Sequence, residues 1–266
     1  MVPIEEWAAA ARVRHSRRRY TGETVAPETL AALREHCEDF QPFEGVRVVV
    51  VPEPSVDVFA GLMGGYSPPK GSTSLLVIVG DTSAHDVETK LGYTGEAAIL
   101  EATRLGLGTC WVAGFFSRRK VRKLVELEPT EKAFAVSPLG YASAEKDGAE
   151  KVYNRRALSE LAPGVAAGKW PDWAFEGLTL ARIAPSAVNR QPWRFRLDGG
   201  GVVVSVDPKA RAYGISPRLD CGIAMLHFEL GALVSGGVGG WQLLPSPDVA
   251  RYSLLPTGGG LQDGLA

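Results

Sequence analysis

A concentrated basic segment, Arg14-His15-Ser16-Arg17-Arg18-Arg19-Tyr20, is the first candidate ligand site in the sequence. Guanidinium groups bind phosphate bidentately, through charge-assisted hydrogen bonds that are about twice as strong as neutral ones. The whole chain has a formal net charge of -1, so this positive charge is local. The arginine segment (residues 14–20) is therefore interpreted as a phosphate site, the alternatives being an ordinary solvated basic face or a nucleic-acid patch.

The second candidate is a corner between two prolines, Pro185-Ser186-Ala187-Val188-Asn189-Arg190-Gln191-Pro192-Trp193. Proline fixes φ and removes a backbone donor, so this stretch cannot continue a helix or a paired strand. Between the prolines, the polar side chains of Ser186, Asn189 and Gln191 can form hydrogen bonds either to the backbone or to the edge of a ligand. The Pro-Ser corner (residues 185–193) is interpreted as a capped turn or as a binding corner.

Two further stretches are weaker candidates. Residues 106–115 (GLGTCWVAGF) begin with glycines, which let backbone N–H groups approach a flat ligand, although a simple helix stop is the alternative. Arg155-Arg156 is a basic pair that would matter only as a further phosphate ligand. Cys110 stands in an apolar setting with no neighbouring histidine, which favours packing over a role as nucleophile.

Composition limits the class of protein. The chain has 266 residues, 45% hydrophobic and 22% charged, which fits a soluble globular protein of one large domain or two modest halves. A net charge of -1 argues against nucleic-acid or anionic-membrane partners, and neither a membrane-spanning run nor a signal peptide is visible. The three cysteines and four histidines are scattered, so neither disulfides nor a metal site are predicted. A reducing cytoplasm is the expected compartment.

Apolar periodicity, together with Gly and Pro boundaries, predicts helices and strands throughout the chain. The first half is predicted to have helices at residues 4–11, 27–37, 54–62, 91–105 and 117–127, and strands at 46–51, 75–79 and 133–136. The second half is predicted to have helices at 173–183 and 218–234, a hairpin of 194–197 with 202–206, and strands at 241–244 and 252–255. Residues 161–169 read as a linker and 258–266 as a disordered tail.

The order of predicted elements repeats. Each half has a helix, a Gln-Pro-aromatic corner, a strand or hairpin, and then a long helix rich in small residues. Gln41-Pro42-Phe43 corresponds to Gln191-Pro192-Trp193, and residues 95–99 to residues 222–226. We therefore predict an α+β fold built by internal duplication, with one half at residues 1–160 and the other at 170–257.

These motifs carry a family resemblance. The arginine segment resembles the Arg-Arg-Ser-x-Arg-x-Phe opening of the FMN-dependent nitroreductase family, and the Pro-Ser corner matches that family's Pro-Ser-x-x-Asn-x-Gln-Pro-Trp motif at every fixed position. Residues 106–111 are similar to its Gly-Leu-Gly-Thr-x-Trp segment, and residues 155–158 to its closing basic motif. Together the four motifs span nearly the whole chain.

The resemblance implies a nitroreductase-like fold with FMN at an interface. It implies an arginine and serine cluster at the phosphate, the Pro-Ser corner against the isoalloxazine, and backbone N–H groups near residues 113 and 114 facing the flavin N5 and O4. The implied cofactor-binding residues are Arg14, His15, Ser16, Arg18, Val112, Ala113, Gly114, Arg155, Arg156, Pro185, Ser186, Ala187 and Asn189. No catalytic side chain is expected, because the cofactor carries the chemistry.

The resemblance also implies an activity. NAD(P)H would give hydride to the flavin and leave, and an electron-poor acceptor such as a nitroaromatic or a quinone would then take the electrons. The alternative is a degenerate member of the family that binds FMN or another small ligand without turnover, which a fold match cannot exclude.

The sequence departs from the family pattern in the order of its motifs. The Pro-Ser-x-x-Asn corner normally follows the first motif within the same half, but here residues 35–43 stand in that place and keep only Gln-Pro-aromatic. The intact corner lies in the second half. This resembles a fused subgroup in which one chain corresponds to the family's dimer. We therefore expect a monomer, or at most a weak dimer, and one FMN per chain.

Overall fold

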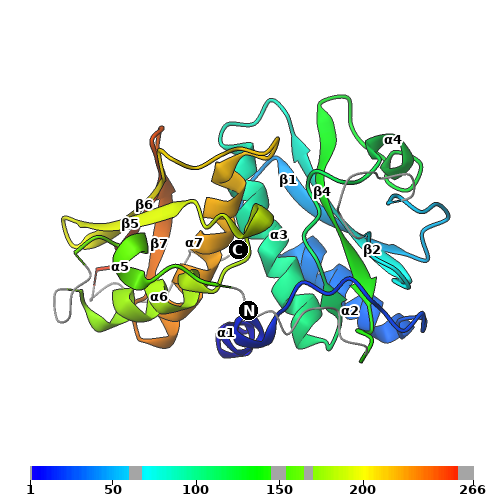
Figure 1. The fold of residues 1–266 in the computed structure, drawn as a ribbon, viewed down its shortest axis with the longest axis horizontal. Coiled ribbons are helices and arrows are strands. Elements are labelled where there is room, and N and C mark those ends of the chain that lie inside the picture. The colour runs from blue at the N-terminus through cyan, green and yellow to red at the C-terminus, as the bar shows by residue number, and fades with distance from the viewer. Residues whose placement is uncertain (1, 60–67, 145–153, 165–169, 257–266) are drawn as a thin grey trace.

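The protein is seen here as a computed structural model that describes residues 2–59, 68–144, 154–164 and 170–256. Two four-stranded antiparallel sheets lie on the outer sides of the molecule, and two long helices, α3 (Val87–Arg104) and α7 (Pro217–Val234), cross between them (Figure 1). None of the helices in these ranges is long and apolar enough to cross a membrane.

The first half contains the sheet β1-β2-β4-β3. Its remaining elements are α1 (Ile4–Val13), α2 (Pro27–Asp39), β1 (Val46–Pro52), β2 (Ser74–Asp81), β3 (Gly108–Thr109), α4 (Arg118–Val121) and β4 (Glu131–Gly140). Side chains alternate across a strand, and β2 shows the consequence. Leu76 and Ile78 belong to a core shared with α2 and α3, whereas Val77 belongs to a separate core on the other face of the sheet.

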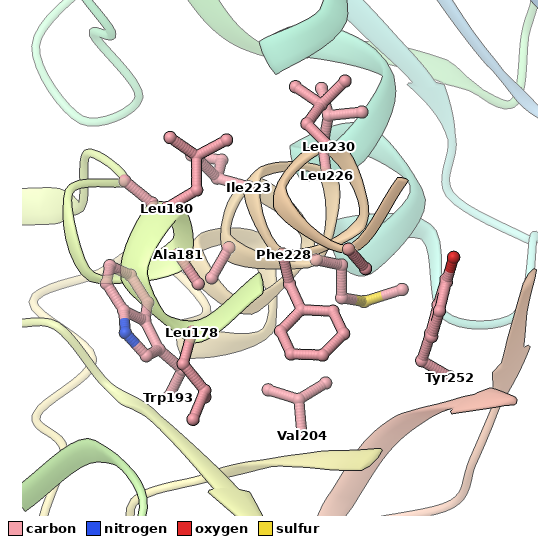
Figure 2. Packing of buried hydrophobic residues seen from close by; sticks show 14 of the residues in the cluster. Leu178, Leu180, Ala181, Trp193, Val204, Ile223, Leu226, Phe228, Leu230 and Tyr252 are labelled. Atoms are coloured by element: carbon pink, nitrogen blue, oxygen red, sulfur yellow. The ribbon is translucent and has the colours of Figure 1, made fainter. Parts of the chain in front are cut away.

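The second half contains the sheet β5-β6-β8-β7. Its elements are α6 (Asp172–Arg182), the short 3-10 helix η1 (Ala187–Asn189), β5 (Trp193–Asp198), β6 (Gly201–Val206), α7, β7 (Gly239–Leu243) and β8 (Asp248–Leu254). The short helix α5 (Leu158–Leu161) lies at the predicted end of the first half but packs on α6 and β5 of the second. Its core surrounds α7, and Figure 2 shows Phe228 pointing from that helix toward Val204, with Trp193 and Tyr252 on either side.

The two halves have the same order of parts. In each, a helix precedes two paired strands, a long helix follows, and the last two strands complete a sheet of the same strand order. This confirms the predicted α+β class, and the matched order is what an internal duplication predicts.

Two glycines set the crossing of α3 and α7. A Cβ on Gly92 would lie 2.0 Å from the carbonyl oxygen of Leu219, and a Cβ on Gly222 would lie 2.0 Å from that of Thr89. Only glycine permits such a close approach of two backbones. Gly92 and Gly222 are 130 positions apart, as are Thr89 and Leu219, so the crossing is symmetric in sequence as well as in space.

This symmetry corrects the predicted register of the repeat. The sequence comparison aligned residues 95–99 with 222–226, which pairs Gly95 with Gly222, but the structure pairs Gly92 with Gly222. Gly95 has another role, because a Cβ there would lie 2.5 Å from the indole of Trp111. Gly92 and Gly95 lie three positions apart on one helix, so the sequence alone does not show which of them contacts the partner helix.

Other differences are local. Residues 54–59 form bends and turns where a helix was predicted; the rest of that prediction, the tail and much of the linker lie outside the described residues. The basic helix predicted at 117–127 is shorter in the structure. It spans only Arg118–Val121, and the chain continues as turns. The strand predicted at 133–136 runs from Glu131 to Gly140, through Pro138.

Candidate functional site

A cavity of about 570 Å³ lies where the two halves meet, a size typical of small-molecule sites. Its walls come from the arginine segment, the residues after β3, the Pro-Ser corner, the loop before α7 and the first turns of α7. Eleven of the thirteen residues predicted for the cofactor line it: Arg14, Ser16, Arg18, Val112, Ala113, Gly114, Arg155, Pro185, Ser186, Ala187 and Asn189.

The structure does not bring the other two predicted residues to this cavity. The Nδ1 atom of His15 lies 2.7 Å from the carbonyl oxygen of Val13, close to its own backbone. Arg156 lines a second cavity, and its backbone N–H donates to Oε1 of Gln191 at 2.8 Å.

Arg14 is a buried cation at the wall of the cavity. Its side chain is only 3% exposed, and its Nε atom is 3.7 Å from Oε1 of Glu96. Within the described residues, the Nε and Nη1 atoms are buried and have no hydrogen-bond partner. Because buried donors are costly to leave unpaired, this guanidinium is suited to an anionic ligand in the cavity.

Glu96 holds this part of the site together from α3. Its Oε1 lies 2.8 Å from Nε2 of His227 on α7, and its Oε2 accepts a hydrogen bond of 2.6 Å from the indole nitrogen of Trp111. Both Glu96 and His227 are fully buried. The carboxylate therefore fixes Trp111 in the cavity wall, places a negative charge beside Arg14, and joins the helices of the two halves.

The arginine segment is ordered by the glycine-rich segment that follows α3. Ser16 forms a parallel bridge with Thr109 of β3, and the amide of Arg17 donates to the Thr109 carbonyl at 2.7 Å. Gly108 leaves the space for this contact, since a Cβ there would lie 3.2 Å from the side chain of Arg17. Two separate sequence motifs are thus one structural unit.

Two backbone amides belong to adjacent residues that line the same cavity. Val112 exchanges hydrogen bonds of 2.9 Å with Val136, which fixes the chain just before residues 113 and 114. The amides of Ala113 and Gly114, which line the cavity, donate no hydrogen bond to the part of the chain that the structure describes. Adjacent N–H groups of this kind suit acceptor atoms on the edge of a ligand.

The polar side chains of the Pro-Ser corner fix its shape. Ser186 Oγ accepts from the backbone N–H of Gln191 at 3.0 Å, and the side-chain Nε2 of Gln191 donates to the Asn154 carbonyl at 3.1 Å. Arg155 donates from Nη1 to the Ala184 carbonyl and to Oδ1 of Asn189, both at 2.8 Å. These side chains therefore stabilise the turn, as the capped-turn interpretation of the Pro-Ser corner predicts. The corner as a whole also forms a wall of the cavity.

Backbone strain is concentrated in this corner. Val188, Asn189 and Gln191 have φ values of 47°, 57° and 48°, in the left-handed region that a β-branched valine rarely adopts. Such residues cost on the order of 1–3 kcal/mol each and persist only where their surroundings hold them. The buried Trp193 packed on the core of the second half anchors one end of the strained corner (Figure 2).

Arg190 ties the corner to α7 through a buried ion pair and to the loop that precedes α7 through hydrogen bonds. Arg190 Nε donates to Asp220 Oδ2 at 2.6 Å, and its Nη1 donates to the carbonyls of Arg211 and Ala212 at 2.7 Å. Burial raises the pKa of Asp220 to about 6, although Arg190 opposes the rise. Arg190 therefore holds in place the loop that carries Tyr213, an exposed ring on the cavity wall.

A sequence profile of the family described as "Putative TM nitroreductase" matches residues 7–232. The chain belongs to this nitroreductase family. Membership places it in a family of oxidoreductases.

Among the solved structures that the chain resembles, one shows the same fold over nearly the whole chain. A "putative nitroreductase" from Thermotoga maritima is 19% identical, covers 94% of both chains and has a TM-score of 0.61. A nitroreductase family protein from Streptococcus pneumoniae is 14% identical over 57% of this chain and 96% of its own, with a TM-score of 0.47. An FMN-dependent nitroreductase from Clostridium difficile is 21% identical over 52% and 88%, with a TM-score of 0.41. No curated protein matches the chain.

Sequence reasoning missed several residues of this nitroreductase-family site. Asp220 lines the cavity, and Glu96 and His227 support it from behind. A signal existed for all three, because each is an ionisable residue inside an apolar helical run, and such residues are buried only when paired. For Tyr213 and Ile215, which line the cavity from a loop, the sequence holds no comparable signal.

Proposed function

We propose that this chain is an FMN-dependent oxidoreductase that passes electrons from NAD(P)H to an electron-poor acceptor such as a nitroaromatic or a quinone. The observation that carries the proposal is Arg14, a buried guanidinium on the wall of an interfacial cavity, two nitrogens of which have no hydrogen-bond partner among the described residues. A phosphate group would supply the acceptors that these nitrogens lack.

The residues present fit FMN. Arg14, Ser16 and Arg18 would hold the phosphate, and the Pro-Ser corner would lie against the flat ring system from the opposite half. The amides of Ala113 and Gly114, which donate to no acceptor in the described part of the chain, would donate to acceptor atoms on the edge of the ring. FMN held there would supply the redox chemistry that links NAD(P)H to the acceptor.

The chain's own contribution is positioning. Glu96 orients Trp111 and faces Arg14. Arg155 holds the backbone of the corner, and Arg190 ties the corner and the following loop to α7. We assign no side chain as an obligatory acid or base, because positioning and electrostatics are what such a cofactor requires of the protein.

The crossing of α3 and α7 supports one cofactor per chain. Leu219 and Ile223 line the cavity, and their counterparts 130 positions earlier are Thr89 and Tyr93. The Tyr93 ring is stacked on Phe40 at 6.3 Å between ring centroids. The place that corresponds to the cavity is therefore covered by aromatic side chains.

Those side chains form one continuous group. Phe40 stacks on His36 at 5.5 Å, and Trp7 of α1 meets His36 edge-on at 5.0 Å and Phe40 at 5.4 Å. Trp7 is fully buried, and its indole nitrogen donates to Glu101 at 2.8 Å. A ring system of FMN would have to displace this cluster, so a second equivalent is not expected.

The visible spectrum of the purified chain, followed by NAD(P)H oxidation with an added quinone, tests the proposal. We expect flavin bands and steady oxidation that depends on the quinone. Flavin bands without oxidation would favour the non-catalytic family member, and failure to bind added FMN would overturn the cofactor assignment.

A further inference from the structure

A second cavity, also of about 570 Å³, adjoins the first and has a different chemical character. Five of its lining side chains are cationic and two are carboxylates, although the whole chain has a net charge of -1. Tyr213 lines both cavities, so they share a wall in the loop before α7. This basic cavity also contains Arg156, the predicted phosphate ligand that the first cavity lacks.

The two carboxylates of the basic cavity already have partners. Asp207 pairs with the guanidinium of Arg194 and accepts from the amide of Lys209 at 2.9 Å. Glu160 accepts from the amide of Ala157 at 3.0 Å and lies 3.6 Å from Nη1 of Arg156. These acids therefore do not neutralise the remaining cations.

The remaining positive charge is available to a ligand. Lys209 and Arg211 are exposed, and across the described ranges neither side chain has an ion pair or a hydrogen bond. Burial lowers the pKa of Arg194, Asp207 opposes this, and the nearby charge of Arg156 adds to the lowering. Because Arg156 and Arg194 are each paired with a carboxylate, Lys209 and Arg211 carry the positive charge that a bound anion would meet.

We propose that the basic cavity binds the 2′-phosphate of NADPH while the nicotinamide reaches the cofactor in the adjacent cavity. This inference rests on the proposed function, and it predicts that the chain prefers NADPH to NADH. The two nucleotides differ by that single phosphate, which arginines can bind bidentately. Loop residues 209–213 would contact the nucleotide at both cavities.

Calorimetry on the FMN-loaded chain tests the site without relying on turnover. Adenosine 2′,5′-bisphosphate should bind at least about tenfold more tightly than adenosine 5′-monophosphate, the discrimination expected of one charge-assisted contact. Lys209→Ala combined with Arg211→Ala should remove that difference. Arg34→Ala, an exposed cation on α2 in the other half, is the matched control and should keep it.

Equal affinities for the two nucleotides, or an unchanged preference in the double variant, would overturn the assignment. Inorganic phosphate binding as tightly as the bisphosphate would reduce the cavity to a general anion site and would also overturn it. The double variant should raise the KM for NADPH at least about tenfold and leave the KM for NADH unchanged.

The kinetic outcomes separate the two proposals. Equal turnover with both nucleotides, unaffected by the double variant, would contradict the phosphate site and leave the proposed function standing. Bisphosphate preference without turnover on either nucleotide would support the site and contradict the proposed function.

Discussion

Replacing Arg14 by methionine is the sharpest perturbation of the candidate site, because it keeps the aliphatic stem and removes only the guanidinium. The Arg14 side chain is 3% exposed, lies 3.7 Å from Glu96, and has two nitrogens without hydrogen-bond partners in the described structure. Its loss should therefore change the stability of the unliganded fold little. Glu96 keeps His227 and Trp111 as partners.

The effect on FMN affinity should be large. Breaking one partner of a desolvated charge pair costs about 2–5 kcal/mol, which is roughly 30- to 5,000-fold in Kd. Titration of the apo protein with FMN measures this loss, and Arg18→Ala should also weaken binding strongly. Arg12→Met is the control, because Arg12 lies on α1 two residues upstream and is exposed.

Thermal unfolding of each apo variant accompanies the titration. Unchanged FMN affinity in both Arg14→Met and Arg18→Ala would refute the phosphate assignment. A loss of affinity in Arg14→Met matched by Arg12→Met, or explained by an unfolded apo protein, would refute the reasoning from the unpartnered nitrogens.

Three further predictions concern the fold. Burial raises the pKa of Asp220 from 3.8 to about 6, so the folded state holds this proton more tightly and stability is lost as pH rises from about 4 to 6. The free energy of unfolding in urea should therefore be measured for the wild type and for Asp220→Asn. The wild-type value minus the variant value should fall by about 2 kcal/mol between about pH 4 and pH 7, and a difference that does not change with pH would contradict the burial effect. Gly222→Ala should destabilise by about 1–3 kcal/mol or more because its Cβ would meet the Thr89 carbonyl, whereas Gly240→Ala, with nothing within 4 Å, should not. Light scattering should show a monomer, and a tight dimer formed through the α3 and α7 surfaces would count against one chain corresponding to the family's dimer.

The sequence predicted most of the cavity because its walls are motifs. Gly, Pro and polar residues predict the local backbone geometry of three segments: the arginine segment, the glycine-rich segment and the Pro-Ser corner. Their meeting across two halves follows from the duplicated order of elements. Such local signals do not say which side chains serve the ligand and which serve the turn. Asn189 and Gln191, for example, are bonded to the segment at Asn154 and to each other.

What the sequence could not predict depends on contacts between distant segments. Gly92 and Gly95 differ only in which surface each one meets, α7 or Trp111. Arg155 and Arg156 are neighbours in sequence, yet their side chains line different cavities. The loop holding Tyr213 is positioned by Arg190, a residue that occupies a variable position of the corner motif.

The most direct measurement is the ratio of flavin to protein after the purified chain is saturated with FMN and desalted. One FMN per chain is predicted, held between the halves, because Arg14 and the Pro-Ser corner complete one cavity while Trp7, His36 and Phe40 cover its counterpart. A ratio of two FMN per chain would contradict the claim that aromatic side chains cover the second position. A ratio of zero would contradict the cofactor site itself.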